Sequence, residues 1–250
     1  NEMSVSSTLG VCVYPQADQP SLCVQDACVK EDGSVALEIS ASLNDPDGYE
    51  RLVVRITGID PAWGVDTSLS GGNYNAATGT WTLILPLGVT SWSGGPTLYP
   101  PHNSDVDMTG LVVTAAAFEY GTSASVSDTI DVIVDAVADF PNIALHDAAG
   151  EGGQQIALCI EPSVTDTDGS ESIVKVFIGG LPEGFSLSAG TQLPSGIWVL
   201  TPAQLNGLTL NTPEGFNGEF DLQARAVSRE TDLSDIEKDS SDNSANTVSF

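Results

Sequence analysis

The chain repeats itself at a constant spacing, and this repetition limits the folds that it can adopt. Residues 5–20 (VSSTLGVCVYPQADQP) align with residues 126–141 (VSDTIDVIVDAVADFP), an offset of 121 residues. The same offset places VALEI at 35–39 over IALCI at 156–160 and continues without a gap into the loops that follow. A single offset over so long a stretch indicates two copies of one structural unit, joined in series.

Each copy begins after a short Ala-Asp-x-Pro linker, and the linkers set the expected domain boundaries. They occupy residues 18–20 and 139–141. We therefore expect a first complete unit over 21–138 and a second over 142–250, whose closing strand is incomplete. Residues 1–17 resemble the closing strand of a preceding unit.

The hydrophobic pattern within each unit predicts β-strands. Segments such as SVALEISAS (34–42), RLVVRITGI (51–59) and LVVTAAAFEY (111–120) are short, rich in Val, Ile and Thr, and partly alternate apolar with polar residues. Clusters of Gly, Asn, Pro and Asp separate them, and no segment keeps a helical period. The sequence therefore predicts an all-β fold made of two tandem Ig-like antiparallel β-sandwiches.

The charge of the chain excludes several classes of partner. Its 250 residues include 34 acidic and 7 basic ones, for a formal charge of −27 at pH 7. Nucleic acid and anionic membrane surfaces both need a cationic face, so neither is expected as a partner. No run approaches the roughly 18–20 apolar residues of a membrane helix, so direct membrane insertion is not expected either. The acidic excess is better explained as a soluble surface that also supplies metal ligands.

Several motifs together resemble a known group of proteins. They are the ADxP linkers, EDGSVALEISA (31–41), the DPDG and DTDG loops, GLPEGFSLSAG (180–190) and IWVLTPAQLNGLTL (197–210). The set resembles the tandem Ig-like, cadherin-like repeats of giant bacterial surface adhesins, including RTX-type, type I-secreted adhesins and biofilm proteins. The resemblance implies extracellular modules, on the bacterial cell surface or in a secreted matrix, that bind calcium near their junctions and stiffen with it. The four cysteines depart from the pattern of such repeats.

Each copy also contains an acidic loop, LNDPDGYE (43–50) or VTDTDGSE (164–171), whose residue types suit calcium. Two aspartates one residue apart and a glutamate after a glycine direct several oxygens toward one point, and Ca²⁺ takes roughly six to eight oxygen ligands. The alternative is an acidic turn, because Asp and Gly are favoured in turns in any case. Recurrence in register within so acidic a chain favours calcium. The predicted ligands are Asp45, Asp47, Glu50, Asp166, Asp168 and Glu171.

Further oxygen ligands are expected from outside these loops. In cadherin-like chains, the loop of one domain and the adjoining linker meet at a junction, and the resemblance therefore makes the linker aspartates candidates. The alternative for each residue is a solvated surface carboxylate. The additional candidates are Asp18, Asp139, Glu31, Asp26 and Asp147.

The four cysteines leave several possibilities open. Cys23 and Cys28 are close enough in sequence for a local disulfide, with free thiols as the alternative. Zinc binding by this pair is not favoured, because the spacing is longer than usual and a second ligand pair is missing. Cys12 and Cys159 have no obvious partner within one domain.

The chain is not expected to be an enzyme. It has only two histidines, His102 and His146, each in a predicted loop, and no nucleophile elbow or oxyanion-hole motif. An active site duplicated together with its turns, and without an added cleft element, is also unusual.

Three functions remain open. The leading one is a calcium-stiffened structural extender of a surface adhesin or filament. The second is an adhesive module that binds sugar or peptide through Trp92 and Tyr99 in the loop at 89–103, for which core packing is the alternative. The third is a filament subunit whose residues 5–17 complete the sandwich of the next copy, with Cys12 and Cys159 available for a covalent lock. The alternative to this last function is a fragment of a longer chain.

Overall fold

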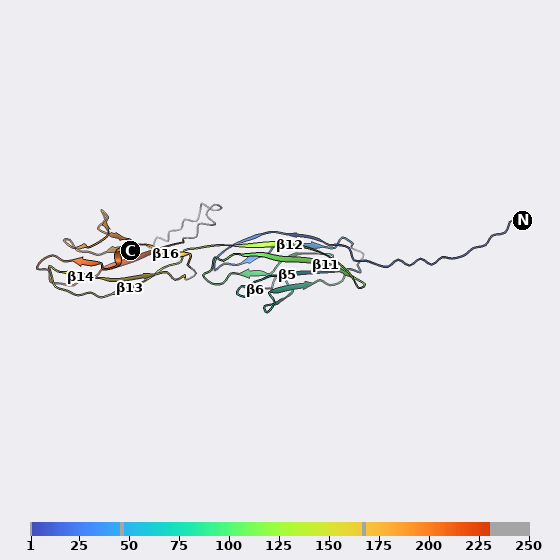
Figure 1. The fold of residues 1–250 in the computed structure, drawn as a ribbon, viewed down its shortest axis with the longest axis horizontal. Helices are drawn as coiled ribbons and strands as arrows, with labels where there is room; N and C mark the ends of the chain where they lie inside the picture. Colours follow the sequence, from blue (N-terminus) through green and yellow to red (C-terminus); the bar gives the residue numbers. More distant parts are fainter. Residues whose placement is uncertain (1, 46–47, 167–168, 231–250) are drawn as a thin grey trace. The chain divides into compact units, whose positions relative to one another are not determined.

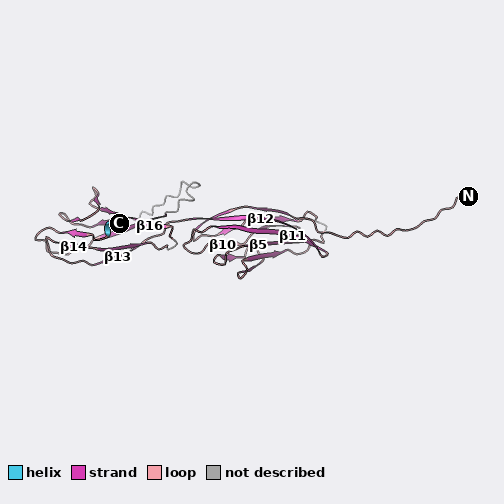
Figure 2. Cartoon of the chain, viewed as in Figure 1, coloured by secondary structure: helices cyan, strands magenta, loops and turns pink. Residues whose placement is uncertain are grey.

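The computed structural model describes residues 2–45, 48–166 and 169–230. The chain divides into one compact unit of Asn1–His102 and Val106–Val134 and another of Asn103–Asp105 and Asp135–Phe250. Both units consist of strands joined by turns, and the described residues contain one short 3₁₀ helix (Figures 1 and 2). Among these residues, no helix is long and apolar enough to cross a membrane.

The first unit contains three sheets. Their strand orders are β2-β12-β11-β5-β8-β7, β1-β4-β9 and β3-β10-β6. The longest pairing is the antiparallel hairpin of β11 and β12, which turns at Tyr120 and Gly121. The strands are β1 (Ser21–Val24), β2 (Ala27–Lys30), β3 (Val35–Ala36), β4 (Ile39–Ser42), β5 (Arg51–Thr57), β6 (Gly64–Asp66), β7 (Asn73–Asn75), β8 (Thr80–Ile84), β9 (Ser91–Gly94), β10 (Thr97–Tyr99), β11 (Met108–Glu119) and β12 (Thr122–Asp135).

The core of this unit follows from alternation along its strands. Leu52, Val54 and Ile56 of β5 are fully buried, whereas the residues between them are more exposed, because successive side chains of a strand point to opposite faces. Trp81 of β8 and Leu98 of β10 lie in the same core cluster. The six-stranded sheet therefore packs against the smaller sheets as one layer of a sandwich.

The second unit has a similar arrangement of sheets. Its sheets have the orders β18-β19-β16-β21, β14-β20-β17 and β13-β15. Its core includes Val176 and Ile178 of β16, Leu200 of β19 and Leu210 of β20. The elements are β13 (Asn142–His146), β14 (Gln155–Ala157), β15 (Cys159–Ser163), β16 (Glu171–Gly179), β17 (Ser186–Leu187), β18 (Thr191–Gln192), β19 (Trp198–Leu200), the 3₁₀ helix η1 (Pro202–Leu205), β20 (Thr209–Asn211) and β21 (Gln223–Glu230).

The predicted fold class is confirmed: the chain is all-β and forms two tandem Ig-like sandwiches. Two segments differ from expectation. Residues 2–20 contain no strand, because an isolated strand needs a neighbour for its backbone hydrogen bonds and no described strand pairs with this segment. The stretch at 89–103 is not an open loop but contains β9 and β10, which pair with β4 and with β3 and β6.

The alternation along the six-stranded sheet predicts contrasting effects of two isoleucine truncations. Ile56→Ala should lower the unfolding free energy of the first unit by about 2–5 kcal/mol, because it leaves a cavity under a central strand. Ile84→Ala on neighbouring β8 should cost at most about 0.5 kcal/mol, because Ile84 is exposed. Chemical denaturation of both variants checks the difference, and equal losses would contradict the assigned faces of the sheet.

Candidate metal centre

Glu50 is the most deeply buried acidic side chain among the described residues of the first unit. It is the last residue of the acidic loop, immediately precedes β5 and is 1% exposed. Its Oε1 accepts a hydrogen bond from the backbone N–H of Asp18 at 2.8 Å. Its Oε2 is buried and makes no hydrogen bond to any residue that the structure describes. A buried carboxylate with one unsatisfied oxygen is costly unless a cation or a proton compensates it.

The linker of the first unit is tied to the same end as Glu50. The backbone N–H of Ala17 donates to Thr122 Oγ1 at 2.8 Å, at the turn between β11 and β12. Asn44, in the acidic loop, donates from Nδ2 to the carbonyl of Gln19 at 2.7 Å and accepts a bond from the Ser21 hydroxyl. Linker and loop therefore meet within the first unit.

A second buried glutamate lies across the strand pair from Glu50. Phe118 of β11 is paired with Arg51 of β5, so the next residues along the two strands are Glu119 and Glu50. Glu119 is also buried. The antiparallel register thus places two carboxylates beside each other at the end of the sheet where the linker enters.

Glu171 occupies the corresponding place in the second unit. It is the first residue of β16, is 7% exposed, and neither of its carboxylate oxygens makes a hydrogen bond of standard geometry to a described residue. Burial raises the pKa of Glu171; the nearby Ser228 hydroxyl and the backbone of Asp139 oppose the rise, and the charges of Asp139 and Asp166 add to it. The carboxylate therefore lies in a strongly negative environment that a cation would relieve.

Two more acidic side chains join Glu171. Glu230 is its direct partner across the β16–β21 ladder. Asp166 is buried, and the Ser170 hydroxyl lies 3.4 Å from its Oδ2 and 3.2 Å from Glu230 Oε2. One hydroxyl proton can serve only one of these two oxygens at a time. The Ser170 hydroxyl alone therefore cannot satisfy both carboxylates.

The linker of the second unit is also held at its cluster. The Ser228 hydroxyl donates to the backbone carbonyl of Asp139 at 2.6 Å, and the Thr165 hydroxyl donates to that of Phe140 at 3.1 Å. Asn103 Nδ2 donates to Asp139 Oδ2 at 3.1 Å. The same contact between linker and acidic loop therefore recurs in both units.

The structure brings together part of the predicted ligand set. Asp18 and Glu50 meet in the first unit, and Asp139, Asp166 and Glu171 meet in the second. Asp45 lies in the loop before Glu50 and is half-buried. Asp47 and Asp168 lie outside the described residues.

Three other predicted ligands lie apart from the acidic loop of their own unit. Asp26 Oδ1 accepts the backbone N–H of Asp131 at 2.9 Å, and Asp131 is about 30 Å along β12 from the Thr122 end. Glu31 is buried in the turn after β2. Asp147 is exposed just beyond β13, at the end of the β13–β15 pair opposite Asn142 and Ser163. None of the three reaches the loop of its own unit.

The sequence reasoning missed Glu119 and Glu230. The offset of 121 residues does not relate them, because the loops of the second unit are shorter. The two residues share one feature. Each is an acidic residue at the end of a strand, β11 or β21, and that strand pairs with the one that begins at the acidic loop, β5 or β16. Recognising that feature requires the strand register, which a single sequence does not contain.

The donor set is suitable for a hard cation. Among the described residues, the clusters offer carboxylate, hydroxyl and backbone oxygens from a loop, a linker and a strand end, and such mixed oxygen sets suit Ca²⁺. Loop and strand residues that approach from different directions also suit its irregular coordination better than the strict octahedron of Mg²⁺.

The aromatic residues expected at a ligand surface are not brought together. Trp92 of β9 is half-buried, and its ring lies 5.7 Å from that of Trp81 in the core. Tyr99 is exposed on β10, which belongs to a different sheet. Trp92 does line an open pocket with Leu22 and several serines of β1, β4 and β9, but Tyr99 does not take part in it.

All four cysteines are exposed free thiols. The local disulfide expected between Cys23 and Cys28 is not formed, because Cys23 lies on β1 and Cys28 on β2, and these strands belong to different sheets. Cys12 lies in the N-terminal segment without regular structure, and Cys159 begins β15.

Comparisons with known proteins identify no family. No protein-family model and no curated protein sequence matches the chain. Among solved structures, the major pilin subunit BcpA (D312A) of Bacillus cereus matches with a TM-score of 0.39 and 8% identity, covering 86% of this chain and 67% of that one. AggA, the major subunit of Escherichia coli aggregative adherence fimbriae, matches with a TM-score of 0.31 and 13% identity, covering 49% and 98%.

A cohesin of ScaC from Acetivibrio cellulolyticus, solved with a dockerin of ScaB, has a TM-score of 0.31 and 16% identity and covers 46% of this chain and 99% of that one. At these identities and TM-scores, the matches do not identify a function.

The environment of Glu171 predicts an unusual pH dependence without divalent cations. Because its pKa is raised by folding, the folded state binds the proton more tightly, and stability falls as pH rises from the unfolded value of about 4.3 through the folded pKa. Glu171→Gln should remove this loss and stabilise the second unit at neutral pH. Unfolding free energies measured across this pH range, with a chelator present, test whether the stability of the wild type falls as pH rises. The control Glu183→Gln alters an exposed carboxylate and should keep the wild-type profile; an unchanged profile in Glu171→Gln would contradict the assignment.

Proposed function

We propose that the chain is a calcium-stiffened structural module of an extracellular bacterial surface protein, an adhesin or a filament. One observation carries this proposal. Glu50 and Glu171 occupy the same place in the two repeats, at the end of the acidic loop, and both keep buried carboxylate oxygens that make no hydrogen bond of standard geometry to a described residue. A duplicated arrangement of this kind is costly for folding unless an ion completes it.

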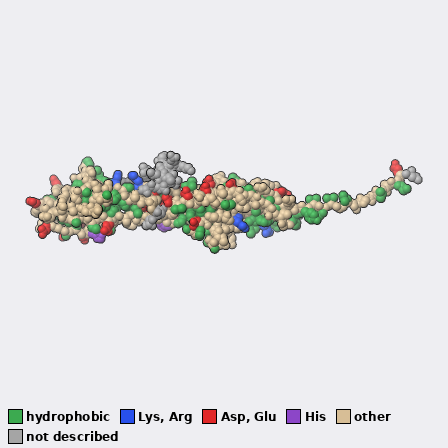
Figure 3. Space-filling view, viewed as in Figure 1, with side chains coloured by type: hydrophobic (Ala, Val, Ile, Leu, Met, Phe, Trp, Pro, Cys, Tyr) green, Lys and Arg blue, Asp and Glu red, His purple; other side chains and the backbone are tan. Residues whose placement is uncertain are grey.

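The charge of the chain supports a cation as the missing component. Acidic side chains outnumber basic ones on the face shown in Figure 3, in line with the formal charge of −27. A field of this sign raises the local concentration of divalent cations. The motif resemblance to tandem repeats of bacterial surface adhesins supports calcium independently of this geometry.

Stiffening follows from where the clusters lie. In each unit the linker reaches the cluster: Asp18 donates to Glu50, and Asp139 lies beside Glu171. An ion held by the acidic loop and the linker of one unit restricts the backbone dihedrals of that linker. Ordering the backbone of each linker residue costs about 1–2 kcal/mol in conformational entropy. Calcium binding supplies the free energy that offsets this cost.

Calcium should raise the melting temperature of both units. An ion at about 100 times its dissociation constant stabilises a site by about 2.7 kcal/mol, which corresponds to a shift of about 10 °C or more for a domain of roughly 100 residues. Glu50→Gln should abolish the shift of the first unit only, and Glu171→Gln that of the second only. Calorimetric scans with calcium and with chelator measure both transitions.

The matched controls are Glu38→Gln and Glu183→Gln, which change exposed carboxylates in the first and second units. Both controls should keep the full calcium shift. If the melting temperature of the wild type is the same in calcium and in chelator, calcium does not stabilise the units and the proposed role of the ion is wrong.

A second candidate function is favoured by the N-terminal segment. Val11 and Val13 are exposed there, and the repeat aligns them with Val132 and Val134, which are fully buried in β12. β12 lies between β2 and β11 in the first unit. In the second unit, β21 pairs with β16 on one side, and no described strand covers its other edge.

We propose as this second function that residues 5–17 of one copy insert beside β21 of another, so that the chain forms filaments. The exposed apolar side chains along the N-terminal segment are visible in Figure 3. Because the donated strand repeats β12 in sequence, its inward positions are those that β12 buries.

Strand donation predicts association that depends on the inward positions of the segment. Wild-type protein should form oligomers whose size grows with concentration, and Val11→Asp with Val13→Asp should leave monomers, because both charges would enter the recipient core. Cys12→Ser changes the outward position between them and should keep noncovalent association. Sedimentation velocity under reducing conditions, with and without calcium, makes the comparison. A wild-type protein that stays monomeric in both conditions rules this function out.

A further inference from the structure

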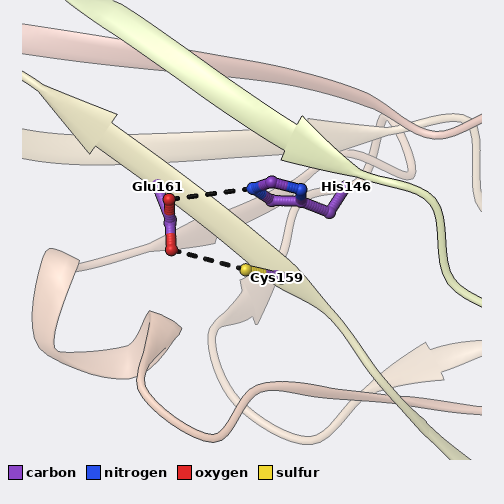
Figure 4. Close-up of side chains that lie close together, drawn as sticks. All are labelled: His146, Cys159 and Glu161. Carbon is purple, nitrogen blue, oxygen red and sulfur yellow. Dashed lines mark hydrogen bonds and ion pairs between the residues drawn. The ribbon is translucent and has the colours of Figure 1, made fainter.

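His146, Cys159 and Glu161 share one face of the β13–β15 pair. His146 and Cys159 are direct partners in this antiparallel ladder. Glu161 is two residues beyond Cys159 on β15, so its side chain points to the same face of the strand. Figure 4 shows the three side chains turned toward one another.

The distances between their donor atoms suit a small metal ion. His146 Nε2 lies 3.7 Å from Glu161 Oε2, and Cys159 Sγ lies 3.6 Å from Glu161 Oε1. One donor atom from each of the three residues lies within 4.8 Å of the others. In a tetrahedral zinc site with bonds of about 2.0–2.3 Å, neighbouring ligand atoms are about 3.3–3.8 Å apart. Small side-chain rotations therefore suffice to place the three donors around one ion.

The strand pair holds these residues on a rigid scaffold. Ile160, between Cys159 and Glu161, points to the other face of β15 and packs against the core of the second unit. Ile143 of β13 packs against the same core. The two strands pair without a break, from Asn142 opposite Ser163 to His146 opposite Cys159. The backbone ladder and the core thus fix the spacing of the three side chains before any ion binds.

The cluster is open to solvent and to incoming ions. The side chains of His146 and Glu161 are 58% and 66% exposed, and Cys159 is exposed as well. Three protein ligands leave a fourth tetrahedral position, which water can occupy.

Burial and the Glu161 carboxylate together set the protonation of the Cys159 thiol. Desolvation raises the pKa of Cys159, and the Glu161 carboxylate raises it further by accepting the thiol proton and by its negative charge. Without a metal the sulfur therefore keeps its proton. A cation beside Glu161 reverses that electrostatic balance, and thiolate binding then releases the proton to solvent.

The first repeat does not contain this cluster. At the offset of 121 residues, Gln25, Glu38 and Ser40 stand where the second repeat has His146, Cys159 and Glu161. The same strand pair exists there as β1 and β4. The second unit therefore combines a histidine, a cysteine and a carboxylate at these positions, whereas the first unit has one carboxylate there, Glu38.

We propose that His146, Cys159 and Glu161 form a zinc site on the second unit, with a nitrogen, a sulfur and an oxygen ligand and water at the fourth position. The site is chemically distinct from the acidic loops. Imidazole and thiolate select borderline and soft ions such as Zn²⁺, whereas Ca²⁺ prefers oxygen ligands. The proposal does not depend on calcium binding.

The test is zinc titration of the full, reduced chain in excess calcium, which occupies oxygen-only sites. Isothermal titration calorimetry should show one zinc ion bound per chain. Cys159→Ser and His146→Gln should each weaken binding by at least about tenfold, since even partners of metal ligands contribute about 10–100-fold. The exposed positions of both residues allow these variants to fold, which their melting curves verify.

Cys28→Ser is the matched control, because Cys28 is an exposed thiol in the first unit. It should leave zinc affinity unchanged. A second readout uses Co²⁺, whose sulfur-to-metal charge-transfer absorption should be present in wild type and in Cys28→Ser and absent in Cys159→Ser. Zinc should also protect Cys159, and not Cys28, from alkylation. Equal zinc affinity in wild type and Cys159→Ser, or alkylation of Cys159 at the same rate with and without zinc, would overturn the proposal.

Discussion

The burial of one glutamate at the start of a central strand, in each of two units, is the constraint on which the remaining features depend. Glu50 and Glu171 lie where the acidic loop meets the sheet, and their carboxylates are taken out of water with too few donors to replace it. The partner glutamates Glu119 and Glu230 add charge at the same places. Such an arrangement persists through two repeats only if something with positive charge compensates it.

The sandwich makes this concentration of charge possible. In the first unit, the fully buried faces of β5, β11 and β12 hold the strand ends in register, so the carboxylates cannot simply move apart into solvent. The linker is bound to the same end by Asp18 and Ala17. The buried carboxylates and the linker therefore lie at the same end of the unit. A bound ion there would change both the stability of the unit and the conformation of its linker.

The sequence predicted the fold class and part of the candidate site because both depend on local patterns. Alternation of apolar residues marks β5, and the repeated Asp-x-Asp-Gly-x-Glu spacing marks Glu50 and Glu171. Features that depend on strand register were missed. Glu119 becomes a neighbour of Glu50 only through the pairing of β5 with β11, and His146 meets Cys159 only through the pairing of β13 with β15.

Sheet membership explains the other differences. Cys23 and Cys28 are five residues apart in sequence, but the turn between β1 and β2 carries the chain from one sheet to another. Trp92 lies in a Gly-rich stretch that favours a loop, but its ring packs on Trp81 because β9 pairs with β4 over the core. Tertiary packing overrides composition at both positions.

Equilibrium calcium binding to the wild-type chain and to Glu50→Gln and Glu171→Gln tests the central claim most directly. The account predicts that each variant loses the ion of its own unit and keeps that of the other, so that the double variant loses both. The same amount of bound calcium in wild type and in the double variant would contradict it.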